Sequence, residues 1–130
     1  MRPLSDALVL IVDDNEMNVK LARDVLQFAG FRTLEAASGG EGVSLAVEHL
    51  PDVILMDIRL PDMDGTDAAR QLKQQERTSR IPVVALTSFA MKGDRERFLA
   101  EGFDGYLEKP ISVTEFPGQV RGYCQAPEGK

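Results

Sequence analysis

The segment Val53-Ile-Leu-Met-Asp57 consists of four apolar residues followed directly by a carboxylate. An apolar run without polar alternation predicts a strand that is buried on both faces, as in a parallel sheet covered by helices. Three further segments follow the same design, in which an apolar run ends in polar residues. They are residues 7–12 before Asp13-Asp14, residues 81–86 before Thr87, and the weaker run 103–107 before Lys109.

The segments between these runs have the periodicity of helices. Their apolar residues recur at amphipathic spacing, and glycines and capping residues mark their ends. A weak strand is also predicted at residues 32–35. The expected helices, with the apolar residues that mark them, are 15–29 (Leu21, Val25, Phe28), 38–50 (Val43, Val47, Leu50), 65–76 (Ala69, Leu72), 92–101 (Phe98, Leu99) and one after residue 112. This alternation predicts a doubly wound α/β domain.

The last helix departs from the regular pattern. Its start is predicted at the capping box Ser112-Val-Thr-Glu115 or, alternatively, at Thr114. Pro117, Gly118 and Gly122 are unfavourable in a helix interior, and Pro117 fits as the third helical residue after a Thr114 cap. We therefore expect this helix to be short.

Composition narrows the class of protein. At 130 residues the chain is expected to form one domain, residues 7–123, with an N-terminal extension, 1–6, and a C-terminal tail, 124–130. A formal charge of −6 disfavours binding to nucleic acid or to an anionic membrane. No apolar run has the length of a membrane span or the character of a signal peptide, and the single cysteine, Cys124, has no internal disulfide partner. A cytoplasmic location is expected.

Polar residues follow four of the predicted strands, and parallel strands bring such ends to one edge of the sheet, where α/β domains bind ligands. The residues are Asp13, Asp14, Asp57, Thr87 and Lys109. Three adjacent carboxylates repel one another unless a divalent cation joins them, and oxygen ligands suit Mg²⁺. Lys109 and Thr87 can bind phosphate oxygens. Asp57, at the end of the most hydrophobic strand, is then the candidate nucleophile.

These residues carry a specific resemblance. Over about residues 7–123 the sequence resembles the receiver domain of two-component response regulators, the family of the chemotaxis protein CheY. The matching elements are Ile11-Val-Asp-Asp14, Leu55-Met-Asp57, Leu60-Pro61, Met63-Asp-Gly65, Pro82-Val-Val-Ala-Leu-Thr87 and Lys109-Pro110. Three more elements are similar to single-domain regulators of the DivK type: Asp14-Asn-Glu-Met-Asn18, Phe89-Ala-Met-Lys-Gly-Asp94 and Lys109-Pro-Ile-Ser-Val113. The resemblance implies a flavodoxin-like (βα)5 fold with a parallel five-stranded sheet in the order 2-1-3-4-5.

The resemblance also implies a signalling role. Asp57 would be phosphorylated by a histidine kinase or a phosphotransfer protein, and Thr87 and Lys109 would contact the phosphoryl group. Tyr106 matches the aromatic switch residue of the family, which moves together with Thr87. The peptide bond before Pro110 would be cis, which would aim Lys109 into the site.

The implied metal is Mg²⁺, for which Mn²⁺ can substitute. Asp14, Asp57 and the backbone carbonyl of Arg59 would be direct ligands, whereas Asp13 would act mainly through metal-bound water. Arg59 and Phe89 occupy positions at which the family tunes hydrolysis of the acyl phosphate.

Two other features resemble sites but are interpreted as structural. Asp62-Met-Asp-Gly-Thr66 resembles the nucleophile motif of haloacid-dehalogenase phosphatases, but it follows the end of the strand at Asp57 and is expected to be a loop. His49, the only histidine, is expected at a helix end on the surface.

The leading interpretation is a receiver that catalyses only its own phosphorylation and dephosphorylation and acts by binding a downstream protein. The alternatives are a phosphatase-like hydrolase that uses Asp57 or Asp62, a scaffold that does not need phosphorylation, and a fragment of a larger hybrid kinase or transcription factor. A monomer or weak dimer is expected. The unusual residues around Pro117 leave the output face of the last helix open.

Overall fold

The computed structural model describes residues 7–88, 94–109 and 111–124. Strands and helices alternate along the chain, as the sequence predicts. The elements are β1 (Leu8–Val12), α1 (Glu16–Phe28), β2 (Arg32–Ala36), α2 (Gly39–His49), β3 (Val53–Asp57), α3 (Gly65–Gln74), β4 (Val83–Thr87), α4 (Asp94–Ala100), β5 (Gly105–Glu108) and α5 (Phe116–Tyr123).

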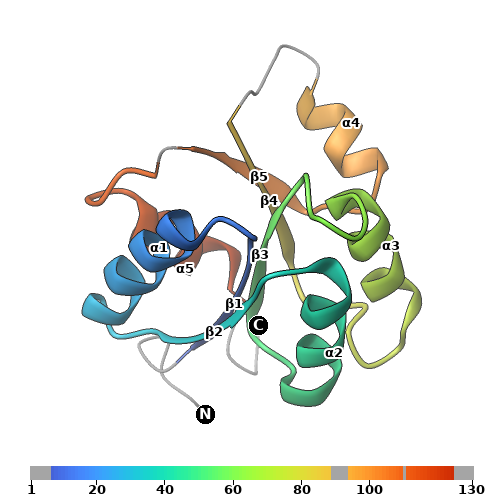
Figure 1. The fold of residues 1–130 in the computed structure, drawn as a ribbon, viewed down its shortest axis with the longest axis horizontal. Coiled ribbons are helices and arrows are strands. Elements are labelled where there is room, and N and C mark those ends of the chain that lie inside the picture. Colours follow the sequence, from blue (N-terminus) through green and yellow to red (C-terminus); the bar gives the residue numbers. More distant parts are fainter. Residues whose placement is uncertain (1–6, 89–93, 110, 125–130) are drawn as a thin grey trace.

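The strands form one parallel sheet in the order β2-β1-β3-β4-β5, which confirms the predicted fold class and strand order. Helices α1 and α5 cover one face of this sheet, and α2, α3 and α4 cover the other (Figure 1). Alternate residues of each central strand enter the two cores, so that Leu55 packs toward α1 and α5 while Ile54 packs toward α2 and α3. Double burial explains the unbroken apolar runs.

The inward face of α1 differs from the expected one. The buried residues are Val19, Ala22 and Leu26, whereas Phe28, expected on the buried stripe, is 96% exposed. Val25 packs at the margin of the core and Leu21 is exposed, so the predicted stripe was wrong. The observed stripe has the same helical spacing, but it is rotated around the axis toward smaller side chains.

Helix α2 shows why small residues face the sheet. Gly42 and Ala46 are its inward residues, while Val43 is only half-buried and Leu50 is exposed, contrary to expectation. A Cβ on Gly42 would lie 2.8 Å from Cγ2 of Val12, so the helix approaches β1 too closely for a side chain there. In α4, Phe98 is buried and Leu99 is exposed.

The last helix begins later than either predicted cap. Ser112 Oγ accepts a hydrogen bond from the Glu115 backbone N–H at 3.3 Å, and Ser112 O accepts one from the Phe116 N–H at 2.8 Å. These bonds close a turn before the helix, so Glu115 takes the N-cap position and Pro117 is the second helical residue. Proline is tolerated there because first-turn N–H groups have no partner within the helix.

Exposed Gly118 on α5 has nothing within 4 Å of the position that a Cβ would occupy. Gly118→Ala should raise the free energy of unfolding by about 0.5–1 kcal/mol, because alanine restricts the unfolded chain and favours the helix. Urea unfolding measures this change. Gly65→Ala is the control and should destabilise, because its Cβ would overlap the Asp57 backbone carbonyl. A loss of stability in Gly118→Ala would contradict the described helix.

Candidate phosphoacceptor site

The four predicted strand ends meet at one edge of the sheet. Asp13 follows β1, Asp57 ends β3, Thr87 ends β4, and Lys109 follows β5. The Lys109 ammonium Nζ lies 2.9 Å from Asp13 Oδ2 and 3.3 Å from Asp57 Oδ2. Lys109 thus joins strands that are not adjacent in the sheet, since β4 and β3 separate β5 from β1.

Three carboxylates converge at this edge. Asp13, Asp14 and Asp57 each place one oxygen so that the three atoms lie within 4.8 Å of one another. Asp13 is buried, Asp57 is half-buried and Asp14 is exposed. An all-oxygen set with one side open to water fits a hard divalent cation such as Mg²⁺, which keeps several of its own water ligands.

Asp13 already uses both of its carboxylate oxygens. Oδ1 accepts a hydrogen bond from the Asn15 N–H at 2.9 Å, and Oδ2 contacts Lys109. The Asn15 side chain in turn accepts a hydrogen bond from the Asn18 N–H and caps α1. The turn after β1 therefore fixes Asp13 and starts the next helix.

The electrostatic balance at Asp57 differs from that of a simple ion pair. Burial raises the pKa of this carboxyl, and the negative charge of Asp13 raises it further. Lys109 and the Arg59 N–H, which lies 3.3 Å from Asp57 Oδ1, oppose this rise in pKa. The pKa of Asp57 still rises because burial is the largest of these influences.

Thr87 and Tyr106 lie on the side of the site toward α4. Thr87 is nearly buried and lines, together with Asp57, Arg59 and Phe98, a cavity of about 200 Å³. Tyr106 is half-buried and packs edge-on against Phe98, with 5.8 Å between ring centroids. Phe89 and Pro110, for which the sequence predicted roles, lie outside the described residues.

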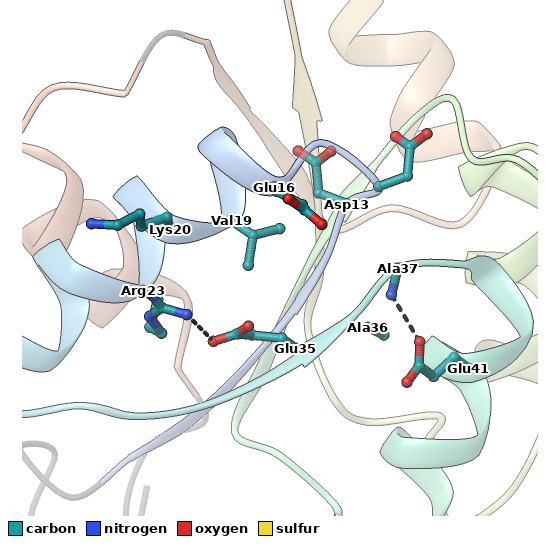
Figure 2. A pocket seen from close by; sticks show the side chains of 10 residues that line it. Asp13, Glu16, Val19, Lys20, Arg23, Glu35, Ala36, Ala37 and Glu41 are labelled. Atoms are coloured by element: carbon teal, nitrogen blue, oxygen red, sulfur yellow. Dashed lines mark hydrogen bonds and ion pairs between the residues drawn. The ribbon is translucent and has the colours of Figure 1, made fainter.

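A second cavity of about 520 Å³ opens beside the carboxylates, between α1, the end of β2 and the start of α2 (Figure 2). Asp13 lies at one side of this cavity, and Arg23 reaches across the opposite side to Glu35, at 3.1 Å. The Glu41 carboxylate accepts a hydrogen bond from the Ala37 N–H at 2.9 Å. The charged groups of this wall are therefore largely paired within the protein.

The sequence did not predict the contact that Asp62 makes with the start of α2. Asp62 lies in the loop after β3, as predicted, but its carboxylate oxygens accept hydrogen bonds from the N–H groups of Gly39 and Gly40, at 2.8 and 2.9 Å. These bonds lower the pKa of Asp62. A local sequence pattern cannot predict this contact, because the residues that form it are more than 20 positions apart. His49 is exposed at the end of α2, as expected.

The fold and site together define a CheY-like α/β domain with an acidic edge. The model of the response regulator receiver domain matches residues 9–121, and the chain belongs to this family. It is 48% identical over 115 residues to the polar-differentiation response regulator DivK of Brucella ovis, covering 88% of this chain and 94% of the relative. The family resemblance seen in the sequence is thereby confirmed, and the chain is a DivK-like receiver of two-component signalling.

Solved structures agree with this assignment. A chemotaxis response regulator of Vibrio cholerae, CheY4, matches with a TM-score of 0.85 and 27% identity, covering 91% of this chain and 98% of that one. The receiver domain of a Pseudomonas aeruginosa sensor histidine kinase, which has a magnesium ion in its active-site cleft, matches with a TM-score of 0.82 and 36% identity. That match covers 91% of this chain and 97% of the kinase domain. Within the described part of our chain, no helix is both long and apolar enough for a membrane span.

Asp57→Asn should stabilise the metal-free protein at neutral pH. A raised carboxyl pKa means that the folded state binds the proton more tightly, so stability present at low pH is lost as pH rises through the folded pKa. Asparagine carries no charge, and we expect the melting temperature at pH 7 to rise by about 4 °C for each kcal/mol recovered. Thermal denaturation with a chelator measures this effect. A gain that did not shrink below about pH 4 would contradict the assigned cause.

Lys109→Met should destabilise the metal-free protein. It would leave the Asp13 carboxylate, which is 1% exposed, without its cationic partner. Removing one partner of a buried ion pair costs about 3 kcal/mol, measurable by urea unfolding. The double variant Asp13→Asn/Lys109→Met is the control and should lose less than the sum of the single variants. Additive losses would show that the ammonium and the carboxylate do not depend on each other.

Proposed function

We propose that the chain accepts a phosphoryl group on Asp57 in a Mg²⁺-dependent reaction and signals through the resulting change of state. The single observation that carries the proposal is the position of the Lys109 ammonium, within ion-pair distance of both Asp13 and Asp57. A positive charge beside a strand-end carboxylate, with two further carboxylates alongside, suits a site that receives a dianionic group.

The transfer forms one bond and breaks one. An Asp57 carboxylate oxygen attacks phosphorus, and the bond from phosphorus to the nitrogen of a phosphohistidine breaks, with its electron pair remaining on that nitrogen. A histidine kinase or a phosphotransfer protein is therefore the proposed donor. In this proposal Lys109 Nζ, 3.3 Å from Asp57 Oδ2, exchanges this contact for one with a phosphoryl oxygen, and the Thr87 hydroxyl would donate a hydrogen bond to another.

The proposed ligands of Mg²⁺ are Asp14, Asp57 and the Arg59 backbone carbonyl. When bound, the ion neutralises charge on the transferred group and favours in-line attack. Asp13 has protein partners on both oxygens, which supports the expectation that it acts through metal-bound water rather than as a direct ligand. Mn²⁺, with the same preference for oxygen, is expected to substitute.

The output is proposed to be a protein contact rather than turnover of an external substrate. The packing of Tyr106 against Phe98 supports a role for Tyr106 in switching, because it joins β5 to α4 near Thr87. We assign this role to the domain at 7–123, in the cytoplasm, acting as a monomer or weak dimer. A phosphatase using Asp62 is disfavoured because that carboxylate is occupied by the start of α2.

Acetyl phosphate with Mg²⁺ should add one phosphoryl group to the wild-type chain, detected by intact-mass spectrometry. Asp57→Asn should remain unmodified, because amide nitrogen and oxygen do not replace the carboxylate nucleophile. Asp52→Asn serves as a matched control and should be labelled, because Asp52 directly precedes β3 and lies at the opposite end of this strand from Asp57. An unmodified wild type, under conditions that label another receiver, would overturn the proposed function.

A further inference from the structure

The loop between β3 and α3 is closed at its base by backbone contacts. The Gly65 N–H donates to the Ile58 carbonyl at 2.6 Å, and Arg59 forms an isolated antiparallel bridge with Asp64. Gly65 must lack a side chain, because a Cβ would overlap the Asp57 carbonyl. The base is thus fixed to the end of β3, and residues 60–63 form the tip.

The tip is fixed from the other side by α2. Each carboxylate oxygen of Asp62 accepts one N–H from the first two residues of this helix, Gly39 at 2.8 Å and Gly40 at 2.9 Å. Met63 lies directly over the same turn, since a Cβ on Gly39 would come within 2.5 Å of Met63 Cγ. A carboxylate at a helix N-terminus is favoured by both hydrogen bonding and the helix dipole.

Arg59 belongs to the base of the loop through its bridge to Asp64, three residues before Asp62 and two after Asp57. Its side chain is exposed, and its N–H donates to Asp57 Oδ1. The position of the Arg59 carbonyl therefore depends on the loop backbone rather than on packing of the Arg59 side chain. If the tip were released from α2, the loop would gain conformations that a metal-ligating carbonyl must lose on binding.

We propose that Asp62 is a positioning residue for the divalent cation, holding the β3–α3 loop against α2 so that the Arg59 carbonyl is presented beside Asp57. This inference rests on the proposed function, because it assigns Asp62 to the same metal site. Asp62 acts through the loop and does not touch the ion. Its contribution resembles that of outer-shell groups that orient metal ligands in other proteins.

The test measures Mg²⁺ affinity without phosphorylation. Backbone amide shifts in the NMR spectrum, followed during titration with MgCl₂, give the dissociation constant for wild type, Asp62→Ala and Asp62→Asn. We expect Asp62→Ala to bind about tenfold more weakly. The Mg²⁺ affinity of Asp62→Asn should lie between those of Asp62→Ala and wild type. An amide keeps one acceptor oxygen and can therefore replace only one of the two hydrogen bonds. Hydrogen exchange at Gly39 and Gly40 in the metal-free protein should be faster in Asp62→Ala.

Ser38→Ala is the matched control. Ser38 Oγ accepts the Glu41 N–H at 3.2 Å, so its removal weakens the same helix start without releasing the loop. Ser38→Ala should therefore bind Mg²⁺ as wild type does. Equal weakening in Ser38→Ala and Asp62→Ala would overturn the inference, because loss of a helix cap alone would then explain the effect.

The failure of each proposal has a different signature. Absence of Mg²⁺ binding by wild type would overturn the proposed function. Wild-type binding with an unchanged dissociation constant in Asp62→Ala would overturn only the role of Asp62. Because the Asp62 side chain is exposed, both Asp62 variants are expected to fold, and Asp62→Asn by itself decides the question if Asp62→Ala does not.

Discussion

The contact on which the site depends is the shared ammonium of Lys109. It lies between the carboxylates of Asp13 and Asp57 at the edge of a sheet whose central strands are buried on both faces. Two carboxylates at this edge would otherwise repel each other across a region of low dielectric constant. The ammonium outweighs the repulsion from Asp13, but burial is the largest influence on Asp57, and the pKa of this carboxyl remains raised. The ion pairs therefore hold this edge of the sheet together while the Asp57 carboxylate remains incompletely stabilised. Such a carboxylate suits a site that binds a cation and a phosphoryl group.

Burial varies across the carboxylates in a way that separates their roles. Asp13 is buried and has two protein partners, so it acts as a fixed charge. Asp14 is exposed, so it can turn toward an ion that still carries water. Asp57, between these extremes, is fixed by β3 at the backbone while its carboxylate remains open to an incoming group. The neighbours Asp13 and Asp14 thus reach different environments, because Asp13 directly follows the buried strand β1 whereas Asp14 already lies in the loop.

The residue patterns predicted the doubly wound fold and the convergence of the strand ends better than they predicted the helix faces, and the family resemblance supplied the strand order. Convergence follows from two rules, that parallel strands share an edge and that ligands bind there. The inward face of a helix depends instead on how closely it approaches the sheet, which is why Gly42 and Ala46 face inward while Leu50 does not. The hydrogen bonds from the start of α2 to Asp62 could not be predicted, because a helix cap supplied by a distant loop leaves no local sequence pattern.

Strand β5 connects this edge to the surface. Lys109, whose ammonium contacts Asp13 and Asp57, directly follows its last residue, Glu108. Successive residues of β5 point to opposite faces. Tyr106 packs against Phe98 of α4, whereas Gly105 leaves room for the Tyr123 ring of α5. Both flanking helices therefore rest on the same short strand. The unusual start of α5 does not remove this contact, because Tyr123 lies at the far end of the helix. Lys109 therefore directly follows a strand that both of these helices contact.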